Sequence, residues 1–179
     1  MSIVRKLLPI AALALSAAPA MADPITLDSS AVGQSFTLNY NGYSSGTVVN
    51  GLTASTTFTL TGVNGSSYTF DYAVANTTAD PLTSRVSSFG FDTDPNITSA
   101  TSTGAFANPT TYSSYPNGIG SIDVCFKDAS TGSCSGGGSG GLADGTSGTG
   151  SFTLNFASAI AALALLRRRR KVQPALALA

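Results

Sequence analysis

Residues 67–76, SYTFDYAVAN, decide the fold class of this chain. Tyr68, Phe70, Tyr72 and Val74 alternate with smaller or polar residues, and a period of two places successive side chains on opposite faces of a β-strand. One face of the strand is therefore apolar and the other is mostly polar. Such a strand fits a sheet that has one buried face and one face in water.

Similar alternating segments recur on both sides of this one. They are SFTLNY (35–40), TTFTLTGV (56–63), VSSFGFD (86–92), GSIDVCF (120–126) and GSFTLNF (150–156). Turn signals such as Asn64-Gly65 and Asp94-Pro95-Asn96 separate them. We therefore expect an all-β fold, an antiparallel β-sandwich of about seven short strands. A Gly-rich solenoid is the alternative, but the chain has no fixed repeat period.

The first 22 residues have the pattern of a secretory signal peptide. A basic start precedes an apolar stretch, and Ala20-Met21-Ala22 places small residues where signal peptidase cleaves. We expect an N-terminal signal helix, recognition by the Sec export machinery and signal peptidase, and cleavage between Ala22 and Asp23. Residues 23–156 would then be the exported β-sandwich domain.

The exported domain is acidic. All nine acidic residues are Asp and lie between Asp23 and Asp144, where Arg85 and Lys127 are the only cations. Nine negative and two positive charges leave a net charge of about −7. A domain with so few cations cannot neutralise many phosphates, so we expect no nucleic-acid partner.

The composition also argues against an enzyme. The chain contains no histidine, no glutamate and no tryptophan, which excludes His-based catalytic triads and His metal ligands. The Asp residues are scattered, and most of them lie in predicted turns, where Asp forms local hydrogen bonds. We therefore expect a protein without catalytic residues and without a cofactor.

One acidic segment, FGFDTDPN (89–96), resembles part of a calcium loop. Asp92, Asp94 and Asn96 offer oxygen atoms at alternate positions, as in the first half of such a loop. The later Gly and the bidentate Glu are absent, and Pro95 stiffens the middle of the segment. A weak calcium site is one interpretation; a strand end followed by a turn is the other.

Cys125 and Cys134 are the only cysteines. In an oxidising compartment such a pair tends to be bridged, and loop entropy assigns a bridge of this length roughly 2–3 kcal/mol of stabilisation. A metal or redox pair is the alternative, although the spacing is not Cys-x-x-Cys. The Gly/Ser-rich residues 133–150 are predicted to be a long flexible loop whose start this disulfide holds.

Residues 157–179 form a tail in which an apolar run ends in a basic cluster. The cluster consists of Arg167, Arg168, Arg169, Arg170 and Lys171, and it is typical of a stop-transfer signal. The apolar residues 156–166 would span roughly 16 Å as a helix, about half of a hydrocarbon core of ~30 Å. We expect a short helical tail that anchors poorly and leaves the protein at most loosely membrane-associated.

Several stretches of the chain form a pattern together. They are PITLDSSAVGQSFTLNYNGY (24–43), GLTASTTFTLTGVNGSSYTFDYAVANTT (51–78), SRVSSFGFDTDPNIT (84–98), YPNGIGSIDVCFK (115–127) with CSGGG (134–138), and GTGSFTLNFAS (148–158). In this order they resemble the bacterial PEP-CTERM proteins, specifically the cistern family. The resemblance implies a signal peptide, an exported β domain and a C-terminal sorting tail that an exosortase cuts. It also implies an association with exopolysaccharide and biofilm matrix in Gram-negative bacteria.

The tail departs from the family pattern. A Pro-Glu-Pro motif is impossible without glutamate, and the apolar run begins inside a predicted strand at Phe156. We infer that the sorting region is truncated or internally deleted near residues 157–161, which leaves exosortase as a partner of the relatives rather than of this chain. The alternative is a complete protein with a short basic tail.

These patterns predict a non-enzymatic exported protein of the cell surface or extracellular matrix, located in the periplasm, at the surface or outside the cell. The alternative is a carbohydrate- or calcium-binding β-sandwich module. Carbohydrate sites usually contain aromatic platforms, for which the candidates are Tyr40, Tyr43, Tyr112 and Tyr115.

Overall fold

The computed structural model describes residues 24–44, 47–115, 120–134, 140–166 and 175–178. The predicted signal helix, the cleavage site between Ala22 and Asp23 and the basic cluster at residues 167–171 lie outside the described residues.

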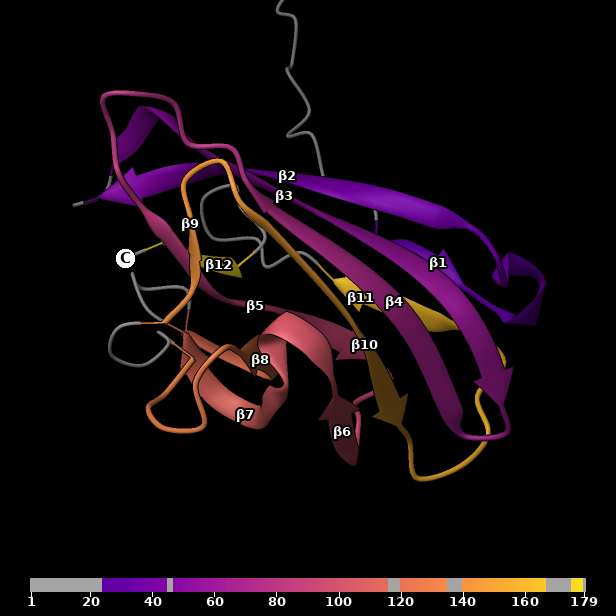
Figure 1. Cartoon of the computed structure of the whole chain (residues 1–179). Helices are drawn as coiled ribbons and strands as arrows, with labels where there is room; N and C mark the ends of the chain where they lie inside the picture. Colours follow the sequence, from indigo (N-terminus) through magenta and orange to yellow (C-terminus); the bar gives the residue numbers. More distant parts are fainter. Residues whose placement is uncertain (1–23, 45–46, 116–119, 135–139, 167–174, 179) are drawn as a thin grey trace, which may run out of the picture.

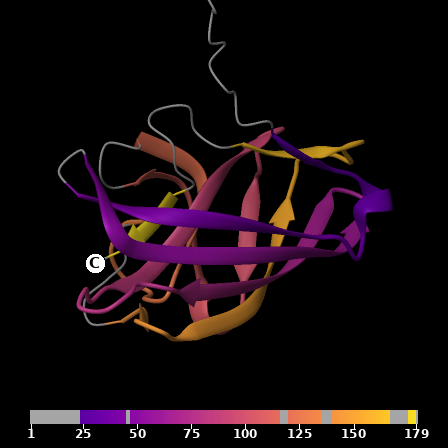
Figure 2. The same cartoon turned by 90° about the horizontal axis from the view of Figure 1, so that it is seen from above.

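Two antiparallel sheets pack face to face around one core (Figures 1 and 2). The five-stranded sheet has the order β2 (Ser35–Ser44), β3 (Thr47–Asn64), β4 (Ser67–Asn76), β10 (Ser147–Asn155) and β6 (Ser99–Ser102). The second sheet has the order β1 (Ile25–Leu27), β11 (Leu163–Leu166), β5 (Arg85–Asp94), β8 (Gly120–Lys127) and β7 (Asn108–Tyr115). Strands β9 (Leu142–Ala143) and β12 (Ala175–Leu178) also pair with β5, and two short 3-10 helices are η1 (Ser29–Ala31) and η2 (Gly104–Phe106).

This arrangement confirms the all-β antiparallel sandwich, but the described residues contain twelve strands rather than about seven. The additional strands are mostly short, from two to four residues. Segments of that length carry too few alternations to be recognised. Strand β10 also begins at Ser147, inside the stretch predicted to be a loop.

The segment SYTFDYAVAN is β4, which lies between β3 and β10. Its apolar side chains are buried, as the alternation predicts. The Asn64-Gly65 turn joins β3 to β4 with Asn64 opposite Ser67, and Gly65 adopts the positive φ of 58° that such a tight hairpin needs.

Aromatic rings from the two sheets meet in the core. Phe152 of β10 lies 4.6 Å from Phe126 of β8 and 5.0 Å from Phe70 of β4, measured between ring centroids. Phe58 and Phe89 are also fully buried and join the same cluster. The rings therefore connect both layers and exclude water from the space between them.

The expected helical tail is wrong for residues 157–166, which contain no helix. Residues 163–166 form β11, which inserts between β1 and β5. Leu163 and Leu165 are buried in the core, while Ala164 and Leu166 are only partly buried, so the segment follows a period of two. The physical reason is that β1 and β5 offer hydrogen-bonding edges, whereas so short an isolated helix is marginal in water.

We predict that Leu163→Ala lowers the free energy of unfolding by about 2–5 kcal/mol, because it empties a fully buried position. The matched control is Leu166→Ala, whose side chain is only half-buried and should cost clearly less. Denaturant unfolding of both variants measures this difference. Equal and small losses would show that the strand contributes nothing to the sandwich.

Candidate functional site

The outer face of the five-stranded sheet is covered with short polar side chains. Neighbouring strands join their hydroxyl groups in pairs, with oxygen–oxygen distances of 2.7 Å for Ser35–Thr59, 2.7 Å for Thr37–Thr57 and 3.1 Å for Thr69–Thr153. This follows from the alternation, since the aromatic residues of the same strands face inward. We call this surface the hydroxyl face; its members are Ser35, Thr37, Thr57, Thr59, Thr69, Asp71, Thr149, Ser151 and Thr153.

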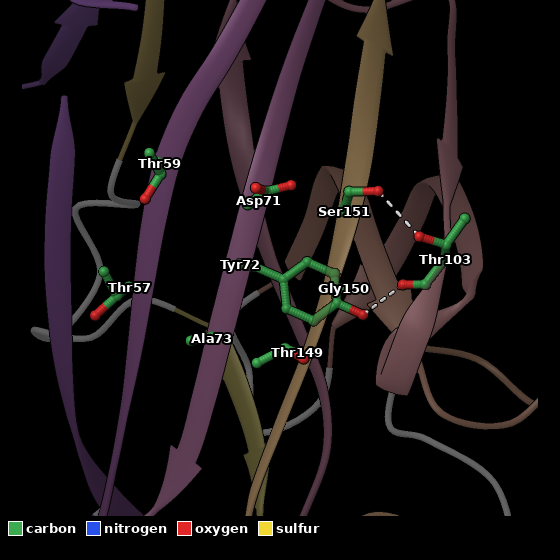
Figure 3. A pocket seen from close by; sticks show the side chains of 9 residues that line it. All are labelled: Thr57, Thr59, Asp71, Tyr72, Ala73, Thr103, Thr149, Gly150 and Ser151. Carbon is green, nitrogen blue, oxygen red and sulfur yellow. Dashed lines mark hydrogen bonds between the residues drawn. The ribbon is translucent and has the colours of Figure 1, made fainter. Parts of the chain in front are cut away.

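A shallow hollow of about 480 Å³ lies on this face (Figure 3). It is lined by Thr57, Thr59, Asp71, Tyr72, Ala73, Thr103, Thr149, Gly150 and Ser151. Gly150 sits opposite Tyr72 in the β4–β10 register, and a Cβ atom there would lie 2.1 Å from the carbonyl oxygen of Thr103. The Tyr72 hydroxyl would lie 2.4 Å from the same Cβ atom, so glycine at this position lets Thr103 and Tyr72 pack directly against the backbone of β10.

Tyr72 forms part of the lining but is engaged in the fold. Its hydroxyl donates to the Thr103 carbonyl at 2.7 Å and accepts from the Phe106 N–H at 2.8 Å. Burial raises the pKa of Tyr72, and the hydrogen bond from Phe106 opposes that shift in part. The phenol is therefore neutral at physiological pH and holds η2 against β4.

Asp71 is the only charged residue among those that line the hollow. It is exposed, and its register neighbours are Thr59 on β3 and Ser151 on β10. Their hydroxyls bond to Ser35 and Thr103 (Figure 3 shows the second of these pairs). The hollow therefore presents one carboxylate surrounded by hydroxyl groups, an arrangement suited to binding hydroxyl or amino groups.

The described cations lie elsewhere in the fold. The guanidinium group of Arg85 donates to the carbonyl of Gly141, and the ammonium group of Lys127, which is only 4% exposed, donates to the carbonyl of Gly132. Neither is paired with Asp71 by any interaction within the described part of the chain, so the charge of Asp71 faces solvent.

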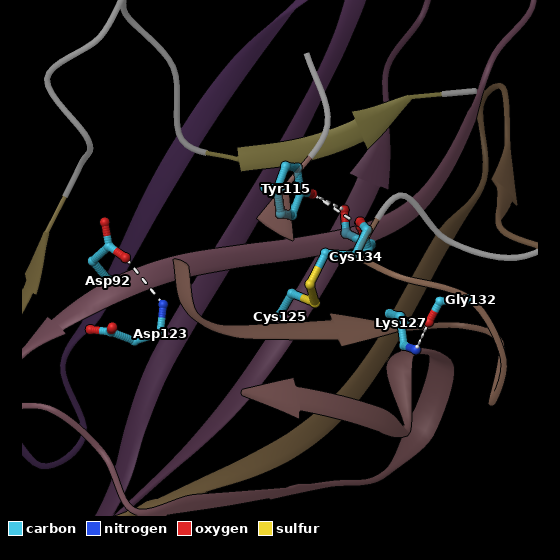
Figure 4. Close-up of a disulfide and its surroundings, with 8 residues drawn as sticks. Asp92, Tyr115, Asp123, Cys125, Lys127, Gly132 and Cys134 are labelled. Carbon is cyan, nitrogen blue, oxygen red and sulfur yellow. Dashed lines mark hydrogen bonds between the residues drawn. A yellow bond between two sulfur atoms is a disulfide. The ribbon is translucent and has the colours of Figure 1, made fainter. Parts of the chain in front are cut away.

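The candidate calcium residues lie at the end of β5 and just beyond it. Asp92 and Asp94 lie at the end of β5, and Asn96 follows them as an exposed residue. The Asp92 carboxylate accepts the backbone N–H of Asp123 at 3.1 Å (Figure 4). The Asp123 carboxylate accepts the backbone N–H of Thr93 at 2.8 Å. These carboxylates extend the β5–β8 pairing. Over the described ranges, no three Asp or Cys side chains are grouped so that they could hold a metal ion.

Cys125 and Cys134 are bridged in the structure, with their Cα atoms 6.0 Å apart (Figure 4). Both residues are fully buried. The Ser88 hydroxyl donates to the carbonyl of Cys134, and the Tyr115 hydroxyl donates to the carbonyl of Ser88 at 3.2 Å. Together with the Lys127–Gly132 bond, these contacts close the loop between the cysteines against β5.

The tyrosines suggested as carbohydrate platforms fall into different environments. Tyr40 and Tyr115 are buried, at 3% exposure each, whereas Tyr112 is 52% exposed and donates its hydroxyl to the carbonyl of Ile97. The side chain of Tyr43 lies outside the described set. Sequence reasoning missed Asp71 and Gly150, whose roles depend on the register between distant strands.

Comparisons of the chain with protein-family models, with curated protein sequences and with solved structures find no significant match. In the described segments, no helix is long and apolar enough to cross a membrane.

We predict that calcium leaves the thermal stability of this protein unchanged within experimental error. Asp92 and Asp123 already accept backbone N–H groups, and Asp94 and Asn96 supply at most part of a coordination shell. A site of micromolar affinity would add about 4 kcal/mol at millimolar calcium. Thermal unfolding in calcium and in chelator, with Asp94→Asn as the control variant, measures the effect. A rise of many degrees that Asp94→Asn abolishes would contradict this expectation.

Proposed function

We propose that this chain is a non-enzymatic exported protein of the cell surface or extracellular matrix, related to the PEP-CTERM cistern proteins. The observation that carries the proposal is the bridged and buried pair Cys125–Cys134. Structural disulfides persist in oxidising compartments and are rare in the cytosol. The signal-peptide pattern of residues 1–22 points to the same compartment.

The position of β11 bears on how the protein is retained. Leu163 and Leu165 fill the core, and the same residues cannot lie in a membrane helix unless the sheet opens between β1 and β5. We therefore propose a product that is released or only loosely bound to the membrane. The basic residues 167–171 would then contact anionic lipid at the surface.

We expect the exported protein to begin at Asp23, to carry one disulfide and to leave membranes in high salt, since its retention would be electrostatic. Intact mass with alkylation before and after reduction checks the first two points. In the alkylation experiment, the Cys125→Ser/Cys134→Ser double variant is the control. Cell fractionation with salt and carbonate washes checks the third point. Alkylated thiols without reductant would contradict the disulfide. A carbonate-resistant pool or a C-terminally trimmed form would contradict the loose membrane association.

The second candidate is a polysaccharide-binding module, and the hollow around Asp71 favours it. The hollow combines one carboxylate with hydroxyl groups from β3, from β10 and from Thr103, which match the hydrogen-bonding groups of a sugar chain. The net negative charge of the domain favours neutral or amino sugars over acidic ones.

We predict that Asp71→Ala weakens binding to the host's own exopolysaccharide about tenfold, because a hydrogen bond to a charged group contributes roughly 1.5 kcal/mol. Asp80→Ala is the matched control, because Asp80 is an exposed carboxylate in a turn away from the hollow. Pull-down on the purified polysaccharide measures both variants. Equal binding by the two variants would show that the hollow is not the sugar-binding site.

A further inference from the structure

The edges of the two sheets are not equally protected. An exposed strand edge offers unpaired N–H and C=O groups, and proteins usually protect such edges with short strands, charges, proline or irregular backbone. In the described part of the fold, the outermost strands are β1 and β7 of one sheet and β2 and β6 of the other, and the very short strands β9 and β12 branch from β5. Strands β1 and β6 are short, and β7 contains Pro109 and an irregularity at Tyr112, whose φ is 50°.

Strand β2 lacks these protections over most of its length. It has ten residues and lies at the outer edge of the five-stranded sheet (Figure 1). The chain has no charged residue between Asp28 and Asp71 and no proline between Pro24 and Pro81. The register shift after Asn41 is an irregularity near the far end of the strand. Residues 35–41 therefore form a regular and uncharged edge.

The register with β3 shows which backbone groups point outward. The N–H of Leu60 donates to the carbonyl of Gln34, so Gln34, Phe36 and Leu38 face β3 by alternation. The backbone groups of Ser35, Thr37 and Asn39 then point away from the sheet. No described residue pairs with that side of β2.

We propose that β2 is a dimerisation edge, on which β2 of a second copy pairs antiparallel about a two-fold axis at Thr37. In this register Thr37 faces Thr37 and Ser35 faces Asn39, so all the outward backbone groups of these residues find partners. Phe36 faces Leu38, and both side chains lie on the core side of the sheet. The partly buried Phe36 would thereby lose further exposed surface.

The strand is complementary to itself. Opposed residues keep the same inner or outer side, so apolar meets apolar and polar meets polar. The absence of charge removes the like-charge contact that a two-fold axis would otherwise create. On the outer side, the hydroxyl pair of Thr37 and Thr57, 2.7 Å apart, would continue into the same pair of the second copy.

Such a dimer would join two five-stranded sheets into one continuous sheet. The two hydroxyl faces would become a single surface carrying two hollows. A polymeric ligand could then contact both hollows at once, and its apparent affinity would exceed that of one hollow. The pairing itself does not depend on the proposed export or on sugar binding.

Sedimentation of the purified full-length chain over a range of concentrations tests the proposal. We expect a concentration-dependent doubling of mass for the unchanged chain. Thr37→Lys and Thr37→Asp should each be monomeric, since the axis sets like charges opposite each other, while an equimolar mixture of the two should recover the dimer. Thr101→Lys, on the short edge strand β6, is the matched control and should still dimerise.

Circular dichroism and thermal unfolding of each variant confirm that it is folded. Thr37→Pro gives a second route, since a proline on an edge strand removes an outward N–H without disturbing the sheet; it should also be monomeric. An unchanged chain that stays monomeric at hundreds of micromolar would overturn the proposal. A dimer that persists in both charged variants, or a mixture that does not recover it, would also overturn it.

Discussion

The fold depends on burying one aromatic face of each sheet against the other. Phe152 is the centre of this contact, because its ring touches Phe70 on its own sheet and Phe126 on the opposite one. Each ring excludes about 150–250 Å² of surface from water. Every strand that carries such a ring must therefore present small or polar residues on its other side. The hydroxyl face is therefore the outer side of the same strands whose aromatic residues form the core.

The sequence predicts those parts of the fold that a single segment determines. SYTFDYAVAN is a strand with the predicted buried side, and Asn64-Gly65 is the predicted turn. Residues 156–166 could not be assigned in the same way, because their alanine and leucine residues fit a helix as well as a strand. Residues 163–166 become a strand because β1 and β5 offer hydrogen-bonding partners on both sides, and those partners lie far away in the sequence.

The candidate site shows the same division. That Thr57 and Thr59 point outward follows from alternation alone. That Gly150 lies opposite Tyr72, and Ser151 opposite Asp71, follows from a pairing between strands separated by many residues. The roles of the carboxylates also depend on the fold. In the sequence, Asp28 and Asp71 are both polar residues in or near a strand, but in the structure only Asp28 caps a helix. Hydrogen bonds from Ser30 lower the pKa of Asp28 and fix its carboxylate at the start of η1.

Asp71 differs from three other carboxylates in having no structural hydrogen bond among the described interactions. Asp92, Asp123 and Asp144 each accept a backbone N–H that the sheets leave unpaired, so their charges serve the architecture. Asp71 instead stands between two strands whose hydroxyls bond to other partners. Its desolvation by a ligand would be compensated only by groups that the ligand itself brings. For the proposed sugar binding, such a hollow would therefore favour ligands with hydroxyl or amino hydrogens over those with phosphate or carboxylate groups.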